Sequence, residues 1–287
     1  FLGDVWPMSS PPLSSDFLRF PTERELVLRS DETLVGVIPE ICLVSHFQVG
    51  NWEVLYRPLT TGNVRRWGLP LMIPNFSRLR NGLFVEKGTS LPIHGFGRLL
   101  PWTLLAAAEQ QVVLELRSNE TTRACYPYDF TFTVTVSVAP ATLTYTLSME
   151  NRSAEVMPIA PGFHPYFAVA QAAKPRLQVQ GLPGFEAAAI DWERQPPDTP
   201  YPFAGQVTIV FPGHGTLTIA ELPQEGRFAL HNMQVWTELP TRPDHAFVCF
   251  EPTVGSEDAL NRPADRLEIA PGTTASIVLQ LRAQVQP

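Results

Sequence analysis

Strict alternation of apolar and polar residues in two neighbouring segments limits the fold more than any other feature of this sequence. Residues 130–138 read FTFTVTVSV, which places Phe and Val on one face of a strand and Thr and Ser on the other. Residues 142–149, TLTYTLSM, repeat the pattern after the turn-forming pair Ala139-Pro140. A period of two is that of a half-buried β-strand, so these segments predict an antiparallel hairpin.

Shorter runs of the same kind recur between Pro, Gly and Asp residues, at 25–29, 34–38, 41–46, 53–57, 112–117, 207–211, 215–220, 246–250 and 275–282. The 29 prolines in 287 residues disfavour long helices, and only residues 256–262 (SEDALNR) suggest a helical turn. We therefore expect an all-β protein: a single large antiparallel β-sandwich with few short helices, forming one domain over residues 1–287. We interpret the Pro-rich segment 195–202 as a surface loop.

Composition excludes several classes of protein. Hydrophobic residues make up 44% of the chain, too many for a disordered protein. The 21 basic and 28 acidic residues form no basic cluster, so we expect no nucleic-acid partner. No apolar stretch has the length of a membrane span, so we expect no membrane partner. Three isolated cysteines and a start without the pattern of a signal peptide favour a cytoplasmic protein with reduced thiols.

Three residues lie outside or at the end of the alternating runs, at positions where catalytic side chains are often found. His94 lies in LPIHGFGRLLPW and His164 in PGFHPYFAV, each among Gly, Pro and aromatic residues that indicate a strand end or loop. Glu251 ends the apolar run AFVCF and precedes Pro252, where a buried strand should reach the surface. Partial desolvation would raise the pKa of this carboxyl group and make it a better base.

None of these residues supports a function by itself. A histidine among aromatic residues can be a hydrogen-bonded core residue, and a strand-end glutamate can be a solvated surface group. Two histidines and a glutamate are also a possible metal-ligand set, but no pair has the HxH or HxxxH spacing that places two ligands on one face. We expect no metal site. The chain also lacks the GxSxG, GxGxxG and GxxxxGK[ST] motifs.

Several segments together resemble the aldose 1-epimerase (galactose mutarotase-like) family. GFHPYF (162–167) resembles the G-x-H-P-Y-F signature of that family, and HGFGRLLPW (94–102) its H-G-F-x-R-x-x-x-W. PNFSRLRNGLF (74–84) resembles its P-N-R-x-R-x-G-x-F segment, and VCFEP (248–252) its V-C-x-E-P. DALN (258–261) and APGTT (270–274) match the usual tail. The resemblance runs from about residue 50 to residue 275, and PIHGFGR and VCFEP are closest to the hexose-6-phosphate mutarotase branch.

This resemblance implies a β-supersandwich with a sugar cleft and an isomerase that interconverts the α and β anomers of an aldose or aldose phosphate. Glu251 would be the base, His164 the acid, and His94 a hydrogen-bonding group near the ring oxygen. The reaction requires neither a metal nor a cofactor. The partner would be a small sugar or sugar phosphate, bound by a monomer or a homodimer.

The resemblance also implies substrate-binding residues. Arg78 matches the substrate-side arginine of the family, with Arg80 as a rival because two extra residues follow Asn75. Arg98 and Arg66 are further cationic candidates for a phosphate or for hydroxyl groups. Four aromatic residues could pack against the C–H face of a sugar or belong to the core: Trp102, Phe163, Tyr166 and Trp236.

Two departures from the family pattern concern the identity of the sugar. Trp67 stands where the hexose-6-phosphate branch has a glycine, so we expect it to crowd whatever space the glycine leaves open. The aspartate that usually precedes the strand at 206–211 is missing, and the nearest aspartates are Asp191 and Asp198. Two other interpretations remain: a non-catalytic carbohydrate-binding protein on the same sandwich, and a structural sandwich whose His and Glu residues only satisfy core hydrogen bonds.

Overall fold

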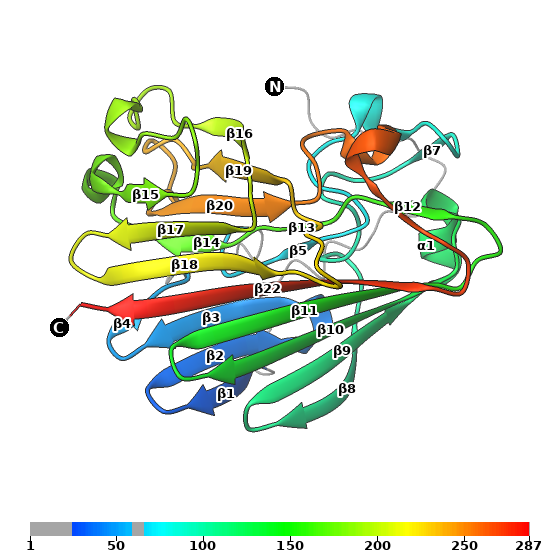
Figure 1. Cartoon of the computed structure of the whole chain (residues 1–287), viewed down its shortest axis with the longest axis horizontal. Helices are drawn as coiled ribbons and strands as arrows, with labels where there is room; N and C mark the ends of the chain where they lie inside the picture. Colours follow the sequence, from blue (N-terminus) through cyan, green and yellow to red (C-terminus); the bar gives the residue numbers. More distant parts are fainter. Residues whose placement is uncertain (1–24, 59–65, 287) are drawn as a thin grey trace.

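The computed structural model describes residues 25–58 and 66–286, and this part of the chain folds mainly as β-strands. Every pair of named strands within it is antiparallel (Figure 1). The all-β antiparallel fold expected from the sequence is therefore confirmed.

The largest sheet has eight strands and contains the predicted hairpin. In spatial order they are β15 (Gln178–Gln180), β17 (Gln206–Phe211), β18 (Gly215–Leu222), β22 (Thr274–Val285), β11 (Thr142–Asn151), β10 (Phe130–Ala139), β9 (Gln111–Arg117) and β8 (Thr103–Ala108). Strands β10 and β11 pair along their whole length, from Phe130 opposite Asn151 to Ala139 opposite Thr142. Their apolar residues are buried at every second position, as the alternation predicts.

The second layer consists of a six-stranded and a four-stranded sheet. The six-stranded sheet joins β16 (Asp198–Pro202), β19 (Asn232–Trp236), β20 (Phe247–Thr253), β13 (Gly162–Phe163) and β5 (Leu71–Met72), and β14 (Tyr166–Ala168) also pairs with β20. The four-stranded sheet joins β1 (Leu26–Ser30), β2 (Thr33–Ile38), β3 (Leu43–Val49) and β4 (Trp52–Glu53). Two small ribbons pair β6 (Leu83–Phe84) with β7 (Thr89–Ser90) and β12 (Met157–Ile159) with β21 (Leu267–Ile269).

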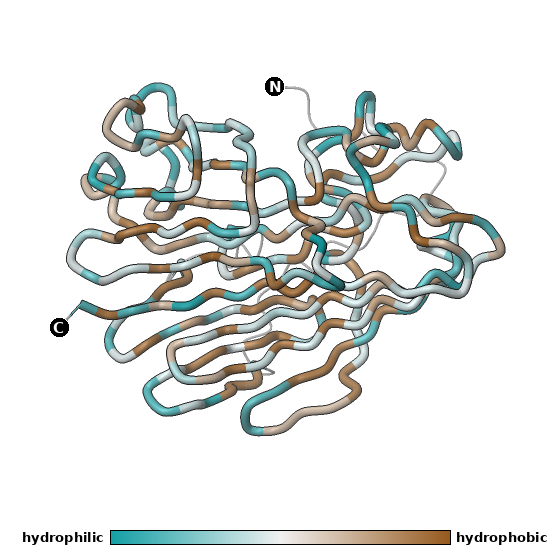
Figure 2. Tube along the Cα trace, viewed as in Figure 1, coloured by the Kyte–Doolittle hydropathy of each residue, from teal (hydrophilic) through white to brown (hydrophobic). Residues whose placement is uncertain are grey.

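Aromatic side chains hold the two layers together. Tyr145 of β11 meets Phe163 of β13 with ring centroids 5.2 Å apart, and Phe167 of β14 meets Phe211 of β17 at 6.1 Å. Figure 2 shows the apolar residues along the stacked strands, while polar residues gather at many of the turns. The core therefore lies between the eight-stranded sheet and the two smaller sheets, which is the arrangement of a sandwich.

Helices are short in the described part of the chain. The α-helix α1 (Glu120–Cys125) begins at Asn119, whose side chain accepts a hydrogen bond from the Thr122 N–H at 3.0 Å. The turn predicted within 256–262 is a 3₁₀ helix, η6 (Ala259–Asn261). No helix among the described residues is both long and apolar enough to cross a membrane. One domain over residues 1–287 stays a prediction.

Two local expectations were wrong. The run at 53–57 is a strand only at Glu53, where β4 ends. The segment 195–202 is not only a loop, because its second half is β16, which pairs with β19 from Asp198–Trp236 to Pro202–Asn232. The prolines are tolerated there because β16 is an edge strand, where a missing N–H breaks no ladder on the outer side. Trp67 fills space in the interior, where it is fully buried in a small cluster with Ile38, Ile41 and Leu43.

Candidate active site

The register of the six-stranded sheet brings His164 and Glu251 together. Gly162 of β13 pairs with Thr253 of β20, and Tyr166 of β14 pairs with Cys249 of β20. His164 lies midway between the two pairings on its side, and Glu251 lies midway on the other. Residues at matching positions of adjacent strands project from the same face. The two side chains therefore face each other although 87 residues separate them in the chain.

The glycine of the GFHPYF segment permits this approach. A Cβ atom at Gly162 would lie 2.4 Å from Cγ2 of Thr253, which is closer than two carbon atoms can pack. Any larger residue would push β13 away from β20, and His164 with it. Gly162 is therefore required for the packing that positions the histidine.

His164 and Glu251 form a buried pair with exchangeable protons. Nε2 of His164 lies 3.5 Å from Oε1 of Glu251 and 3.4 Å from the hydroxyl group of Tyr166. Burial, with a further contribution from Arg98, lowers the pKa of His164 to about 3. Burial, followed by the nearby charge of Asp198, raises the pKa of Glu251 well above its ordinary value, while Arg98 acts in the opposite direction. Both shifts favour the uncharged form of each group.

His94 is held as a neutral hydrogen-bond donor. The backbone N–H of Ser77 donates to Nδ1 of His94 at 3.1 Å, and the backbone N–H of His94 donates to the Ser77 carbonyl at 2.9 Å. Because a backbone N–H can only donate, Nδ1 carries no proton and Nε2–H is free to donate. Burial, followed by the charge of Arg98, lowers the pKa of His94 well below its usual value.

The turn that carries His94 depends on left-handed backbone. His94 has φ +62° and the next residue, Gly95, has φ +67°. A Cβ atom at Gly95 would lie 2.1 Å from the Ile73 carbonyl oxygen, so only glycine fits. The HGFGR segment thus places the histidine ring 5.3 Å from the ring of His164.

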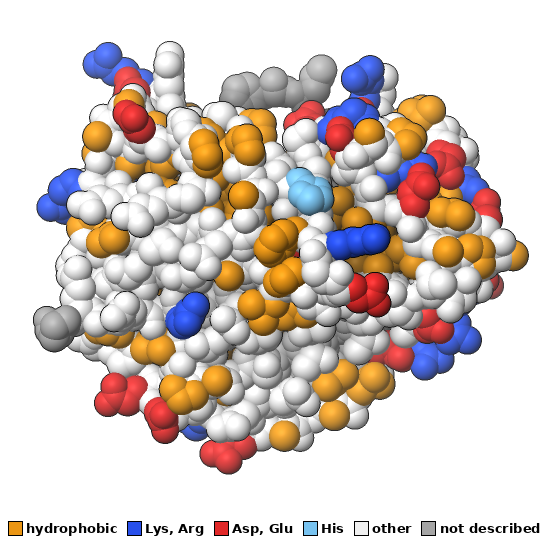
Figure 3. Space-filling model, viewed as in Figure 1, with side chains coloured by type: hydrophobic (Ala, Val, Ile, Leu, Met, Phe, Trp, Pro, Cys, Tyr) orange, Lys and Arg blue, Asp and Glu red, His pale blue; other side chains and the backbone are white. Residues whose placement is uncertain are grey.

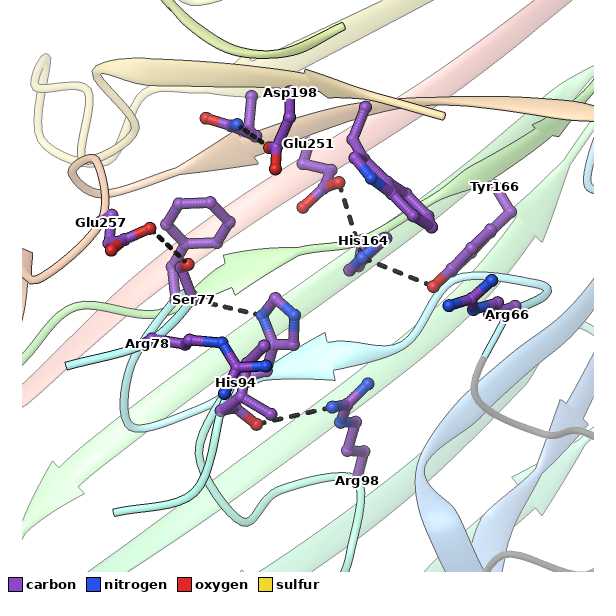
Figure 4. Close-up of a pocket in the computed structure, with 14 residues that line it drawn as sticks. Arg66, Ser77, Arg78, His94, Arg98, His164, Tyr166, Asp198, Glu251 and Glu257 are labelled. Carbon is purple, nitrogen blue, oxygen red and sulfur yellow. Dashed lines mark hydrogen bonds and ion pairs between the residues drawn. The ribbon is translucent and has the colours of Figure 1, made fainter. Parts of the chain in front are cut away.

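The three predicted catalytic side chains lie at one cavity of about 410 Å³ (Figure 4). Its lining includes predicted binding residues: Arg66, Arg78, Arg98, Tyr166 and Trp236. Tyr166 stacks on His164 at 4.5 Å with an interplanar angle of 4°, and Trp236 meets His164 edge-on at 5.9 Å. A cavity of this size, lined mainly by polar and charged side chains with a few aromatic residues, suits a small polar ligand.

The structure places three of the residues named from the sequence outside the cavity lining. The side chain of Arg80 is 81% exposed and lies beside Asp258, with Nε 3.9 Å from its carboxylate. Trp102 is buried and donates from Nε1 to the Gly97 carbonyl oxygen at 2.7 Å. Phe163 is buried against Tyr145. Arg80 and Trp102 therefore leave the set of predicted sugar contacts, because one points to solvent and the other belongs to the core.

Three polar residues that sequence reasoning did not select also line the cavity: Ser77, Gln234 and Glu257. Gln234 lies opposite Glu251 in the β19–β20 ladder, and its Nε2 donates to Oδ1 of Asp198 at 2.6 Å. Asp198 is therefore available for the role of the family aspartate that seemed to be missing before β17. Asp198 could have been selected from the sequence only if the segment QPPDTPYP had been recognised as a strand that pairs with another strand. Glu257 lines the cavity as well and accepts a hydrogen bond from the Ser77 hydroxyl group at 3.3 Å.

A buried lysine stabilises the connection between β19 and β20, which begins next to the cavity residue Trp236. Nζ of Lys174 donates to Oγ1 of Thr237 at 2.9 Å and to the His245 carbonyl oxygen at 2.7 Å. Thr237 in turn donates to the Phe247 carbonyl oxygen at 2.6 Å. These bonds join the two ends of the β19–β20 connection. That connection carries Glu238, which forms an ion pair with Arg66 at the cavity.

The charge of Lys174 predicts a pH effect on stability. Burial lowers its pKa from 10.5 to about 8, so between these values the unfolded chain holds this proton more tightly than the folded chain does. We expect the free energy of unfolding to rise with pH over that interval relative to a Lys174→Met variant, by at most about 3 kcal/mol. Urea unfolding of both chains at about pH 8 and about pH 10 measures this difference. A difference that does not change with pH would contradict the buried charge.

Comparison with known proteins agrees with this geometry. The family model described as aldose 1-epimerase matches residues 80–279, which is more than two thirds of the chain and includes His94, His164 and Glu251. The chain belongs to the aldose 1-epimerase family. This membership supports a mutarotase-type isomerase acting on a sugar.

One curated protein and two solved structures illustrate the similarity. A Salmonella typhimurium protein, named as a candidate glucose-6-phosphate 1-epimerase, is 39% identical over 95 residues, a match that spans 30% of this chain and 30% of that protein. The Slr1438 protein of Synechocystis sp. PCC 6803 has a TM-score of 0.79 at 19% identity, covering 91% of this chain and 96% of its own. The galactose mutarotase related enzyme of Lactobacillus acidophilus has a TM-score of 0.72 at 18% identity, covering 91% and 97%. The two solved structures show that the fold is shared.

Proposed function

We propose that this protein is an aldose 1-epimerase that interconverts the α and β anomers of an aldose or aldose phosphate by general acid/base ring opening. The observation that carries the proposal is the buried His164–Glu251 pair, 3.5 Å apart, at the wall of a cavity of about 410 Å³. Anomer exchange needs two groups that move protons in opposite directions at one site. A histidine and a carboxylate in contact supply both.

The reaction can be followed atom by atom. The Glu251 carboxylate accepts the proton of the anomeric hydroxyl group while the His164 imidazolium donates a proton to the ring oxygen. The bond between the anomeric carbon and the ring oxygen breaks, and its electron pair goes to that oxygen as the carbonyl group forms. After rotation about the adjacent C–C bond, the ring closes on the other face of the carbonyl group and both protons return.

The proton balance fits the electrostatics of the pair. With a closed ring bound, the pair is Glu251⁻ and His164⁺; with the open aldehyde bound, it is neutral Glu251 and neutral His164. Both states hold one exchangeable proton and carry no net charge. Burial lowers the pKa of His164 and raises that of Glu251, so it favours the neutral pair, and the bound closed ring has to stabilise the ion pair. Arg98 stabilises the ionised carboxylate and Asp198 opposes it, so neither state is fixed.

Other residues of the cavity would position the sugar. We assign Nε2–H of His94 to a sugar oxygen near the reacting bond, since Ser77 occupies the other ring nitrogen. Asp198 and Gln234 are suited to hydroxyl groups, because their amide–carboxylate contact leaves polar atoms towards the cavity. Tyr166 and Trp236 offer apolar surface to the C–H groups of the sugar.

A non-catalytic sugar-binding protein on the same sandwich is the competing function. Such a protein would need the cavity but not a buried acid/base pair. The deciding experiment is anomer interconversion by polarimetry or NMR exchange, with glucose, galactose and glucose 6-phosphate as substrates. Exchange above the spontaneous rate with at least one sugar supports the epimerase. Saturable binding of a sugar without any acceleration of exchange would favour the binding protein.

Three arginines at the cavity lead to a prediction about substrate charge. Arg66, Arg78 and Arg98 line it together with Asp198, Glu251 and Glu257, so any preference for a phosphorylated sugar must come from local contacts. Arginine holds phosphate through paired, charge-assisted hydrogen bonds. We expect kcat/KM for glucose 6-phosphate to exceed that for glucose about tenfold, and the ratio to fall as salt screens the contact.

The matched controls for this comparison lie in one segment. Arg78→Gln should lower kcat/KM for glucose 6-phosphate more than for glucose. Arg80→Gln, two residues away and pointing to solvent, should leave both values unchanged. Equal kcat/KM values for the two sugars at low and high salt would exclude the phosphate contact and favour a neutral sugar.

A further inference from the structure

A cysteine lies next to the acid/base pair and has no role in the proton exchange described above. Three possible metal ligands lie within 4.8 Å of one another: one atom each from His164, Cys249 and Glu251. All three residues are buried. Cys249 and Glu251 are two residues apart on β20, so their side chains project from the same face. Together with His164 from the adjacent strand they form a His–Cys–Glu cluster, and these residue types are the ligands that zinc takes in proteins.

The spacing of the cluster is close to that of a metal site. Atoms within 4.8 Å of one another have a common centre no more than about 2.8 Å from each, against zinc bonds of about 2.0 Å to nitrogen and oxygen and 2.3 Å to sulfur. Each ligand therefore has to move by less than about 1 Å. The 3.5 Å between Nε2 of His164 and Oε1 of Glu251 is already near the roughly 3.3 Å that separates two ligands of one tetrahedral ion.

Charge and ligand type select the class of ion. A thiolate and a carboxylate cancel the charge of a divalent cation, so the occupied cluster would carry no net charge inside the protein. Thiolate and imidazole favour Zn²⁺, Cd²⁺ and Co²⁺ over Mg²⁺ and Ca²⁺, which prefer oxygen ligands. His164 and Glu251 line the cavity, which gives the ion a way in and leaves a fourth position for water.

The surroundings indicate reversible rather than permanent binding. Among the described residues, Nδ1 of His164 has no hydrogen-bond partner. A metal-bound histidine usually donates from its second nitrogen to a carbonyl or carboxylate group, and losing that contact costs about 10- to 100-fold in affinity. The cluster therefore has three zinc ligands but lacks the hydrogen bond from the second histidine nitrogen that strengthens zinc binding.

We propose that Zn²⁺ binds reversibly to His164, Cys249 and Glu251 and thereby blocks the acid/base pair. Binding releases to solvent the thiol proton of Cys249 and the proton held by the His164–Glu251 pair. While the ion is bound, neither group can exchange a proton with a sugar. The inhibition rests on the proposed epimerase function, whereas the metal site itself does not.

Cobalt serves as the spectroscopic probe for the site. The full chain is freed of metal with a chelator, transferred to chelator-free buffer and titrated with Co²⁺, and we expect the near-ultraviolet charge-transfer band of a thiolate–cobalt bond. Zn²⁺ should abolish the band by displacement. Cys249→Ser should lose the band, while Cys125→Ser, at a half-buried thiol outside the cluster, should keep it. No band in the unchanged chain, or a band that survives in Cys249→Ser, would overturn the proposal.

Activity gives an independent measurement. Zn²⁺ should inhibit anomer exchange, and a chelator should restore it. With each chain normalised to its own rate in chelator, Cys249→Ser should raise the Zn²⁺ concentration for half-inhibition at least about tenfold. Equal sensitivity of the two chains would count against Cys249 as a ligand.

The two proposals can fail separately. A cobalt band without inhibition by Zn²⁺ would retain the metal site and overturn the catalytic roles of the pair. If the chain shows no anomer exchange in the presence of a chelator, the proposed epimerase function is wrong. The cobalt titration then tests the metal site by itself. If Cys249→Ser does not fold, His164→Asn replaces it: its band should weaken at a given Co²⁺ concentration, and an unchanged titration would overturn the proposed ligand set.

Discussion

Replacing Glu251 with glutamine is expected to lower the turnover of an accepted sugar by a factor of about 100 or more. The amide keeps the shape of the side chain and its place on β20, but it cannot accept the proton of the anomeric hydroxyl group. A positioned general base contributes about 10²- to 10⁴-fold to rate, and the buried setting of Glu251 leaves little room for water to take its place. Sugar affinity should change little, because the amide oxygen still accepts a hydrogen bond.

The measurement is steady-state anomer exchange, with kcat and KM obtained separately. Glu109→Gln, the same substitution at an exposed turn outside the cavity lining, serves as the control and should behave as the unchanged chain does. If Glu251→Gln loses affinity but keeps kcat, Glu251 binds the sugar and is not the base.

The second large effect is expected for His164→Asn, which should also lower turnover by about 10²- to 10⁴-fold. Asparagine can donate a hydrogen bond to the ring oxygen but cannot deliver a proton to it. Because the two groups act as a unit in one ring-opening step, the double variant with Glu251→Gln should be little slower than either single variant. Additive losses would mean that His164 and Glu251 act in separate steps.

Two other histidines provide the comparison. His94→Asn should be impaired less, because its proposed role is to donate a hydrogen bond, which asparagine can partly replace. His231→Asn, at an exposed position outside the lining of the His164–Glu251 cavity, should leave the rate unchanged. A His164→Asn chain as active as His231→Asn would remove His164 from the mechanism.

The alternating segments predicted the strands well because their pattern is local. The runs at 130–138 and 142–149 became β10 and β11 with an offset of two residues at most, and their burial follows the alternation. β8 and β16 were missed because neither alternates: TLLAAA has no polar face, and DTPYP contains two prolines. Both are edge strands, which form because a neighbouring strand pairs with them rather than because of their own pattern.

The site was predicted in part, from motifs rather than from periodicity. GFHPYF, HGFGR and VCFEP directed attention to His164, His94 and Glu251, and the structure brings these three to one cavity. Arg78 and Arg80 could not be separated in the sequence, since both fit the motif. The structure distinguishes them. Arg78 lines the cavity, whereas the backbone N–H of Arg80 donates a hydrogen bond to Oδ1 of Asp258 at 2.9 Å.

The sequence by itself determined the class of fold and the three residues that we propose for catalysis, because strand alternation and short motifs are properties of neighbouring residues. Only the tertiary structure decided which side chains share a surface. Asp198 and Gln234 come next to Glu251 through the pairing of β16, β19 and β20, and no feature of their local sequence predicts this contact. Strand register between distant segments is set by packing of the whole sheet, so a contact such as His164–Glu251 appears only when the sheet has formed.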